Sequence, residues 1–162
     1  MSAMRRFVSI CLLCATVAAC GGGSSTSSAS SDRAQISNLF NAIYTAISHG
    51  DFTTACGDLS KREQSTVVAG ARRAGLNASS CAGAFTALLK ATGVTRARLA
   101  QAFGSAGIKR KVDSISIHGN KATVTFTEVE TGQHTTYLET DALVREDGKW
   151  RADRILKRSK TG

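Results

Sequence analysis

Residues 111–127, KVDSISIHGNKATVTFT, decide the fold class of this 162-residue chain. Apolar and polar residues alternate on both sides of Gly119-Asn120, a dipeptide typical of a two-residue hairpin turn. A period of two is the spacing of a strand with one buried face. The stretch therefore predicts two antiparallel strands, the first over 111–117 and the second carrying Ala122, Val124 and Phe126 on its buried side.

Two more turns extend this hairpin toward the C-terminus. Thr131-Gly132 and Asp147-Gly148 are both turn signals, with a predicted strand over 134–145 between them. A fourth strand over 149–156 holds Trp150, the only tryptophan, which we expect to be buried under the helices. Four consecutive strands with short turns predict an antiparallel meander.

The residues before the meander have helical spacing. Ile36, Leu39, Phe40, Ile43 and Ile47 lie on one face of a predicted helix that begins after an N-cap at Ser31 and stops before Gly50. Shorter helices are predicted over 52–59, over 61–73 behind a Ser60–Glu63 capping box, from Ser79 or Ser80 to Gly93, and from Thr95 to Phe103. Helices first and strands afterwards favour an α+β domain.

The N-terminus reads as an export signal. Arg5 and Arg6 precede an apolar stretch, Phe7 to Val17, that is too short to span a bilayer. Small residues then lead to Cys20, and the segment resembles a bacterial lipoprotein signal. The resemblance implies that residues 1–19 are removed and that Cys20, carrying a diacylglyceryl thioether and its acyl chains, becomes the first mature residue. The alternative is an ordinary secretory signal in which Cys20 falls at the cleavage point by coincidence.

The rest of the chain divides into a tether and one domain. Residues 20–31 are the lipidated cysteine and a Gly/Ser tether, which we expect to be a flexible coil. Residues 32–162, about 130 in all, suit a single domain. We therefore expect an exported protein that is lipid-anchored to the outer face of the bacterial cell membrane.

The five cysteines can be assigned to the signal, the lipid anchor and the exported domain. Cys11 and Cys14 leave with the signal and Cys20 takes lipid, so Cys56 and Cys81 remain as an even pair in an exported domain. In an oxidising compartment this pair predicts a disulfide that closes a loop of about 25 residues. Free buried thiols, or a metal site completed by His49 or His118, are the alternatives.

The formal net charge is +9, and the basic residues gather in two places. One group spans Arg96 to Lys111 and includes Arg110, and the other is the tail from Arg151 to Lys160. An exported protein rarely meets nucleic acid, so an anionic membrane or wall polymer is the nearer partner. The alternative is a solvated surface with no partner. We expect the tail, Arg154 to Lys160, to follow the last strand and to be exposed to solvent.

The order of elements resembles the nuclear transport factor 2-like superfamily, which includes ketosteroid isomerases and polyketide cyclases. The resemblance rests on a helix ending in Gly50-Asp51-Phe52, the short helix with Ala55-Cys56, and the terminal segment 146–151. It covers about residues 32–157. It implies a cone in which helices pack on a curved four-stranded antiparallel meander, and it also suggests small exported lipoproteins in which a cysteine pair staples the helical layer.

Enzymes of that superfamily place an acid, a tyrosine or a histidine inside the cone. The possible pocket residues here are Tyr44, Tyr137 and Asp141, and the last two alternate onto the same face of the third strand. Asp58, His118 and His134 are further polar candidates, and all six could instead lie on the solvent face or at turns. The sequence has no glycine-rich phosphate loop, no paired metal ligands and no nucleophile elbow, so no metal or cofactor is expected.

Two functions follow from these observations. The first is a non-catalytic, membrane-tethered domain that binds a small apolar ligand or a protein of the cell envelope. The alternative is an isomerase- or dehydratase-like enzyme that uses polar residues inside the cone. A filled cone favours the former, and an open apolar cavity with convergent ionisable groups favours the latter.

Overall fold

The computed structural model describes residues 24–104, 107–130 and 135–161. Five helices come first: α1 (Ser24–His49), α2 (Phe52–Gly57), α3 (Lys61–Arg73), α4 (Cys81–Thr92) and α5 (Arg96–Phe103). Four strands follow: β1 (Ile108–His118), β2 (Lys121–Glu130), β3 (Thr135–Glu146) and β4 (Lys149–Lys160). The predicted α+β class is therefore confirmed. The predictions for residues 1–23, including Cys20, and for His134 and the Thr131-Gly132 turn lie outside the described residues.

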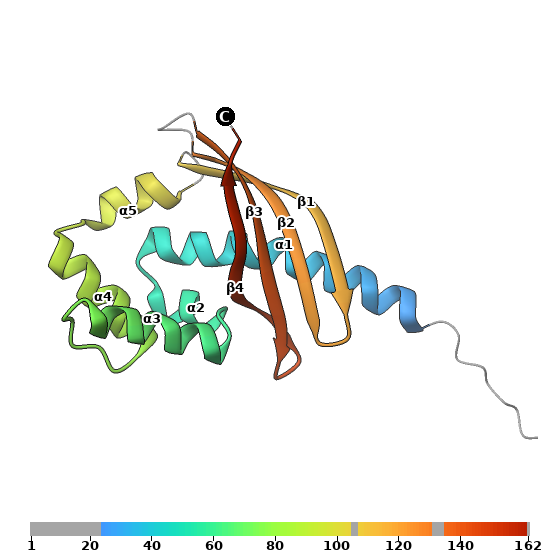
Figure 1. Ribbon diagram of the computed structural model, residues 1–162, viewed down its shortest axis with the longest axis horizontal. Helices are drawn as coiled ribbons and strands as arrows, with labels where there is room; N and C mark the ends of the chain where they lie inside the picture. Colours follow the sequence, from blue (N-terminus) through green and yellow to red (C-terminus); the bar gives the residue numbers. More distant parts are fainter. Residues whose placement is uncertain (1–23, 105–106, 131–134, 162) are drawn as a thin grey trace, which may run out of the picture.

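The strands form one antiparallel meander in the order β1-β2-β3-β4. Figure 1 shows a curved sheet with α1 running across one of its faces, while α2 to α5 gather around the C-terminal end of α1. We name the face that contacts α1 the inner face. The predicted arrangement, N-terminal helices on a curved four-stranded meander, is the one observed.

Two turns set the register of the sheet. His118 pairs with Lys121 across the Gly119-Asn120 turn, and Glu146 pairs with Lys149 across the Asp147-Gly148 turn. Asp147 has φ +51° and Gly148 has φ +76°, both in the left-handed region that the common two-residue hairpin turn requires. Turn chemistry and strand periodicity agree here, which is why the sequence predicted both turns correctly.

The core lies between α1 and the inner face. The predicted apolar stripe of α1 packs against β2, β3 and β4 in a cluster formed by Ile36, Leu39, Phe40, Ile43, Ala122, Val124, Phe126, Leu143 and Trp150. Phe40 and Phe126 contact each other with ring centroids 5.1 Å apart. Trp150 is only 3% exposed, as the sequence predicted.

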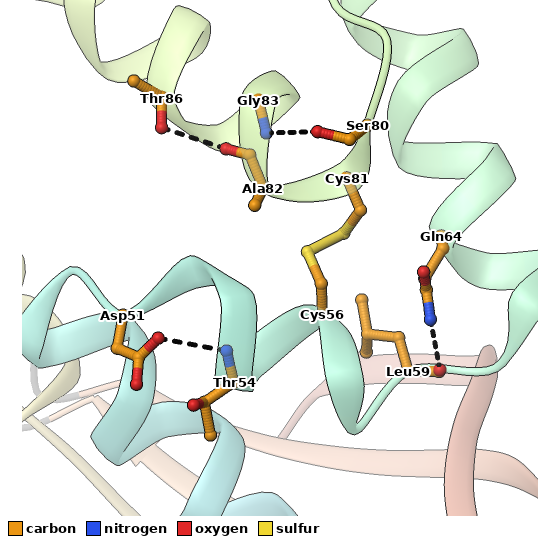
Figure 2. Close-up of a disulfide and its surroundings, with 10 residues drawn as sticks. All are labelled: Asp51, Thr54, Cys56, Leu59, Gln64, Ser80, Cys81, Ala82, Gly83 and Thr86. Carbon is orange, nitrogen blue, oxygen red and sulfur yellow. Dashed lines mark hydrogen bonds between the residues drawn. A yellow bond between two sulfur atoms is a disulfide. The ribbon is translucent and has the colours of Figure 1, made fainter.

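The cysteine pair links the helical layer. Cys56 of α2 and Cys81 of α4 form a disulfide with their Cα atoms 6.0 Å apart (Figure 2). Each helix has its own N-cap nearby: Asp51 Oδ1 accepts from Thr54 N–H, and Ser80 Oγ accepts from Gly83 N–H. The bond thus joins two separately capped helices that are 25 residues apart in sequence.

The segment after α2 joins the helical layer to the sheet. Ser60 N–H donates to the Ala152 carbonyl at 2.8 Å, and Ser60 Oγ donates to Asp153 Oδ1 at 2.8 Å. The same Ser60 hydroxyl accepts from Glu63 N–H, which is the predicted capping box. Because these bonds reach β4, the edge of the sheet beside Ala152 is covered by the chain.

Three elements are longer than predicted. α1 begins at Ser24 rather than after Ser31, so the expectation of a flexible coil is wrong for residues 24–31 of the predicted tether. Ser31 lies within the helix, where its hydroxyl accepts from Gln35. A helix already held by packing adds further residues more easily than it forms a new turn, so small polar residues can extend it. β1 starts at Ile108, and β4 continues to Lys160 instead of ending at 156, because strand pairing uses backbone groups and accepts charged side chains.

None of the helices in the described ranges is both long enough and apolar enough to cross a bilayer.

Candidate functional site

The inner face of the sheet changes from apolar to charged beyond Phe126. Along β2 the inward positions are Ala122, Val124, Phe126 and then Glu128, because side chains two residues apart share a face. Glu128 is 1% exposed, which makes it as buried as the residues before it. On the adjacent β3, Glu139 and Asp141 are 2% and 5% exposed.

Strand register brings two arginines to these acids. Arg110 of β1 pairs across the sheet with Glu128, and Arg158 of β4 pairs with Glu139. The β3–β4 ladder shifts register between Thr140 and Asp141, as it does at a β-bulge. We name the five residues Arg110, Glu128, Glu139, Asp141 and Arg158 the ionic cluster.

Arg110 lies at the centre of the ionic cluster with a side chain only 7% exposed. Its Nε donates to Glu128 Oε2 at 2.6 Å, and its Nη2 donates to the Tyr44 hydroxyl and lies 3.4 Å from Glu139 Oε1. The guanidinium carbon also lies 4.1 Å from the Tyr44 ring centroid and 4.2 Å from that of Phe126. Ion pairs and aromatic faces together compensate for its lost hydration.

Arg158 closes the cluster from the outside. It lies 2.8 Å from Glu128 Oε1, 2.9 Å from Glu130 Oε1 and 3.0 Å from Glu139 Oε2. Its side chain is 36% exposed. The expectation that the tail, Arg154 to Lys160, follows the last strand is therefore wrong, because these residues belong to β4. The expected exposure is confirmed for all of them except Ser159, which is half-buried, and Arg158 also pairs with buried carboxylates. Arg110, which the sequence placed in a basic surface group, is instead buried.

A cavity of about 180 Å³ lies between α1 and this part of the inner face. Its polar lining includes Tyr44, Arg110, Glu139 and Asp141, and its apolar lining includes Ile43, Ile47, Leu59 and Phe103. Among the described residues, three buried polar atoms of the lining side chains have no hydrogen-bond partner: Asp141 Oδ1, Glu139 Oε2 and Arg110 Nη1. Arg110 and Glu139 are held in ion pairs, whereas no ion pair in the described part of the chain reaches Asp141. The cavity lining is otherwise mainly apolar.

Burial changes the acidity of the groups around the cavity. It raises the pKa of Asp141 to about 7, and the nearby Glu139 carboxylate adds to the shift. Burial also raises the pKa of Glu139 and that of the Tyr44 hydroxyl above their ordinary values. Near neutral pH, Asp141 can therefore either hold a proton or carry a charge, while Tyr44 keeps its proton.

The structure brings together two of the three predicted pocket residues. Tyr44 and Asp141 both line the cavity. Tyr137 does not line it; the Arg158 guanidinium covers the Tyr137 ring at 4.2 Å. The predicted alternation of Tyr137 and Asp141 onto one face agrees with the β3 register.

The other polar candidates lie away from the cavity. His118 is exposed beside the first hairpin turn and is hydrogen-bonded to Ser116. Asp58 follows α2 and lies 3.9 Å from Arg151. In the described part of the chain, no group of three or more His, Cys, Asp or Glu side chains is arranged to hold a metal ion.

Sequence reasoning missed Arg110, Glu128, Glu139 and Arg158. A signal for two of them was present: Glu128 continues the inward alternation of Val124 and Phe126, and Glu139 lies two residues before Asp141. If the two-residue alternation had been extended to charged positions, it would have predicted that both acids lie on the inner face. The two arginines have no such signal, because an arginine in a strand is ordinarily on the surface.

No family model matches the chain, and no curated protein matches it. Among solved structures, the chain is similar to a nuclear transport factor 2-like protein of unknown function from Shewanella baltica OS155. The two are 11% identical, the TM-score is 0.46, and the match covers 82% of this chain and 96% of the other. At this identity the likeness concerns the fold alone.

Proposed function

We propose that this protein is a lipid-anchored domain of the bacterial cell envelope that binds a small molecule in the cavity between α1 and the inner face. The ligand is bound without being chemically changed. Cys20 carries the anchor, and the domain lies on the outer face of the membrane.

The observation that carries the binding proposal is the unpaired Asp141 oxygen in the cavity wall. Buried polar atoms are nearly always hydrogen-bonded, and each exception requires an explanation. A ligand that supplies the missing donor would satisfy this atom. The cavity size also limits the ligand, because an apolar cavity of about 150 Å³ holds one benzene molecule. At about 180 Å³ the cavity suits a ligand with one ring or a short branched chain.

The first part of α1 supports a domain held close to its anchor. Figure 1 shows the N-terminal turns of α1 extending past the sheet. The helix begins at Ser24, only four residues after Cys20. At 1.5 Å rise per residue, the segment from Ser24 to Asp32 spans about 12 Å. A helical spacer of this length would keep the domain near the membrane surface without placing it in the bilayer.

Native mass spectrometry tests the binding proposal. The full chain would be purified in mild detergent from its native membranes and compared with Asp141→Asn purified in the same way. We expect a small-molecule adduct on the unmodified chain and little or none on the variant. Equal adduct on both proteins, or no saturable binding of any ring-sized probe, would contradict the proposal.

Cell fractionation tests the anchor. Cys20→Ser should move the protein from the membrane fraction to the soluble exported fraction, and the control Cys14→Ser should leave it in the membrane. Unchanged membrane retention of Cys20→Ser would contradict lipidation at this residue.

An apolar cavity lined by ionisable groups is also the feature expected of the isomerase- or dehydratase-like alternative. We favour binding because Arg110 and Glu139 are engaged in ion pairs, which leaves Asp141 as the buried acid available to a ligand.

One observation nevertheless favours the enzyme. Asp141, whose pKa is raised to about 7, and the Tyr44 hydroxyl line the same cavity, and a general base works best when its pKa is near the working pH. Asp141 would remove a proton, and Tyr44 would donate a hydrogen bond to the developing oxyanion. Solvent deuterium exchange into small cyclic ketones tests this possibility. Exchange that disappears in Asp141→Asn would favour the enzyme, and exchange at the uncatalysed rate would leave binding as the function.

A further inference from the structure

The ionic cluster, taken together with the neighbouring Glu130, contains more acids than arginines. The carboxylates that meet there are Glu128, Glu130, Glu139 and Asp141, and the guanidinium groups among them are Arg110 and Arg158. Three of the four acids are at least 95% buried. Buried charge without a counter-ion is costly, so this excess requires a partner or a proton.

The two arginines are already committed to other acids. Arg110 is paired with Glu128 and Glu139, and Arg158 with Glu128, Glu130 and Glu139. Within the described ranges no ion pair reaches Asp141, and its Oδ1 is buried with no partner. A ligand that pairs with Asp141 would therefore offset the excess negative charge of the ionic cluster.

Arg154 is the internal group that could compete for this role. It lines the same cavity, but it is exposed to solvent and forms no ion pair with Asp141 in the described part of the chain. Glu63 of α3 also lines the cavity. Because Glu63 adds one negative charge and Arg154 one positive charge, these two residues together do not change the net charge of the lining.

We propose that the ligand is a small organic monocation, a protonated primary or secondary amine on an apolar body of about one ring, whose ammonium group donates to Asp141. This inference rests on the proposed binding function and names the ligand class. The apolar body would lie against Ile43, Ile47 and Phe103 on the opposite side of the cavity.

Other ligand classes fit these walls less well. An anion would face Asp141 and Glu139 at close range, which disfavours it. A purely apolar ligand would leave Asp141 Oδ1 unpaired and keep its desolvation cost. An ammonium group supplies N–H donors and the missing charge together, and charge-assisted hydrogen bonds are the stronger kind.

Amine binding should depend on pH, since it requires the ionised form of Asp141. The charged or titratable groups around Asp141 are Tyr44 of α1, Glu63 of α3, Arg110 of β1, Glu128 of β2, Glu139 of β3, and Arg154 and Arg158 of β4. Burial and the neighbouring acids raise the pKa of Asp141 to about 7, and the two cluster arginines oppose this shift. Affinity for an amine should therefore rise about tenfold per pH unit below the pKa of Asp141 and level off above it.

Protein-observed titrations with three probes of one shape test the proposal. Benzylamine, benzyl alcohol and benzoate differ mainly in charge, and each would be titrated into the full chain in detergent between pH 5 and pH 8. At pH 8 we expect benzylamine to bind at least tenfold more tightly than the other two. Asp141→Asn should remove both this preference and the pH dependence. The matched control Asp113→Asn, an exposed aspartate that Thr127 contacts, should keep both.

The outcomes separate the ligand class from the binding function. If benzyl alcohol or benzoate binds as tightly as benzylamine, or if Asp141→Asn keeps the preference, the amine class is wrong while the binding function stands. If no probe binds saturably, the binding function itself is wrong. The pH profile of the unmodified chain gives a second test that requires no variant: a flat profile for benzylamine would overturn the role of Asp141.

Discussion

Val124 and Glu128 lie on one strand, on one face, four residues apart, and they are 0% and 1% exposed. Around Val124 the inner face is apolar and packs against the apolar stripe of α1. Around Glu128 it consists of ion pairs, aromatic faces and a cavity. Equal burial therefore accompanies two different kinds of chemistry in the two halves of a single sheet.

The two halves differ in what burial contributes. In the apolar half, each Å² of surface removed from water contributes about 25 cal/mol. In the ionic half, desolvation of the charges offsets most of their attraction, so such a cluster adds little net stability while loss of one member is costly. We infer that the apolar half holds the fold together and that the ionic half is retained for binding.

The largest effect is expected in the apolar half. Trp150→Ala removes a side chain that is 97% buried in the core cluster and should lower the free energy of unfolding by about 3–5 kcal/mol. The control Leu156→Ala, on the same strand but 48% exposed, should cost less than about 1 kcal/mol. Denaturant melts measure both. A loss below about 1 kcal/mol for Trp150→Ala would show that the apolar half does not dominate stability.

The next effect comes from breaking the ionic cluster. Arg110→Met leaves Glu128 and Glu139 as adjacent buried acids and should cost about 3–4 kcal/mol at neutral pH. The cost is limited because Glu139, whose pKa is already raised, can take up a proton. Lys109→Met, at the adjacent exposed position, should cost less than about 0.5 kcal/mol. Equal stability of the two variants would mean that the ion pairs contribute nothing.

A pH series isolates the contribution of Asp141. Its folded pKa of about 7 lies above the ordinary aspartate value of 3.8, so the folded protein binds an extra proton between these two pH values. The free energy of unfolding should therefore fall as pH rises from about 4 to 7, by about 4 kcal/mol. Asp141→Asn should remove most of this slope and be more stable than the unmodified chain at pH 8. A slope that is unchanged in the variant would assign it to another group.

The smallest effect concerns the end of β4. Arg158→Gln removes ion pairs to three acids but alters a side chain that is 36% exposed, so it should cost about 1–2 kcal/mol. Lys157→Gln, the exposed neighbour, should cost less than about 0.5 kcal/mol. Thermal melts at low and high salt compare them. Identical melting curves for the two variants would mean that the ion pairs of Arg158 add no stability, so that the basic tail is only a solvated surface.

Local rules account for most of what the sequence predicted. The α1 stripe, the inward positions of β2, the Ser60 capping box and the Asp147-Gly148 turn each depend on residues within a few positions of one another. The ends of elements were less well predicted. α1 continues seven residues upstream of Ser31, because a helix that is already packed adds turns easily. β4 continues four residues past 156, because its backbone stays paired with β3.

The sequence by itself determined the α+β class, the meander, the buried face of α1 and the cysteine pair that the structure joins. Each of these follows from periodicity, turn chemistry or parity along the chain, and these can be read from residues close together in sequence. Only the tertiary structure decided that Arg110 and Arg158 form ion pairs with buried acids. It also decided that, among the described residues, no ion pair reaches Asp141. Those pairings join residues 18 to 30 positions apart. They depend on strand register and bulges, which bring the charges together only after the sheet has folded around α1.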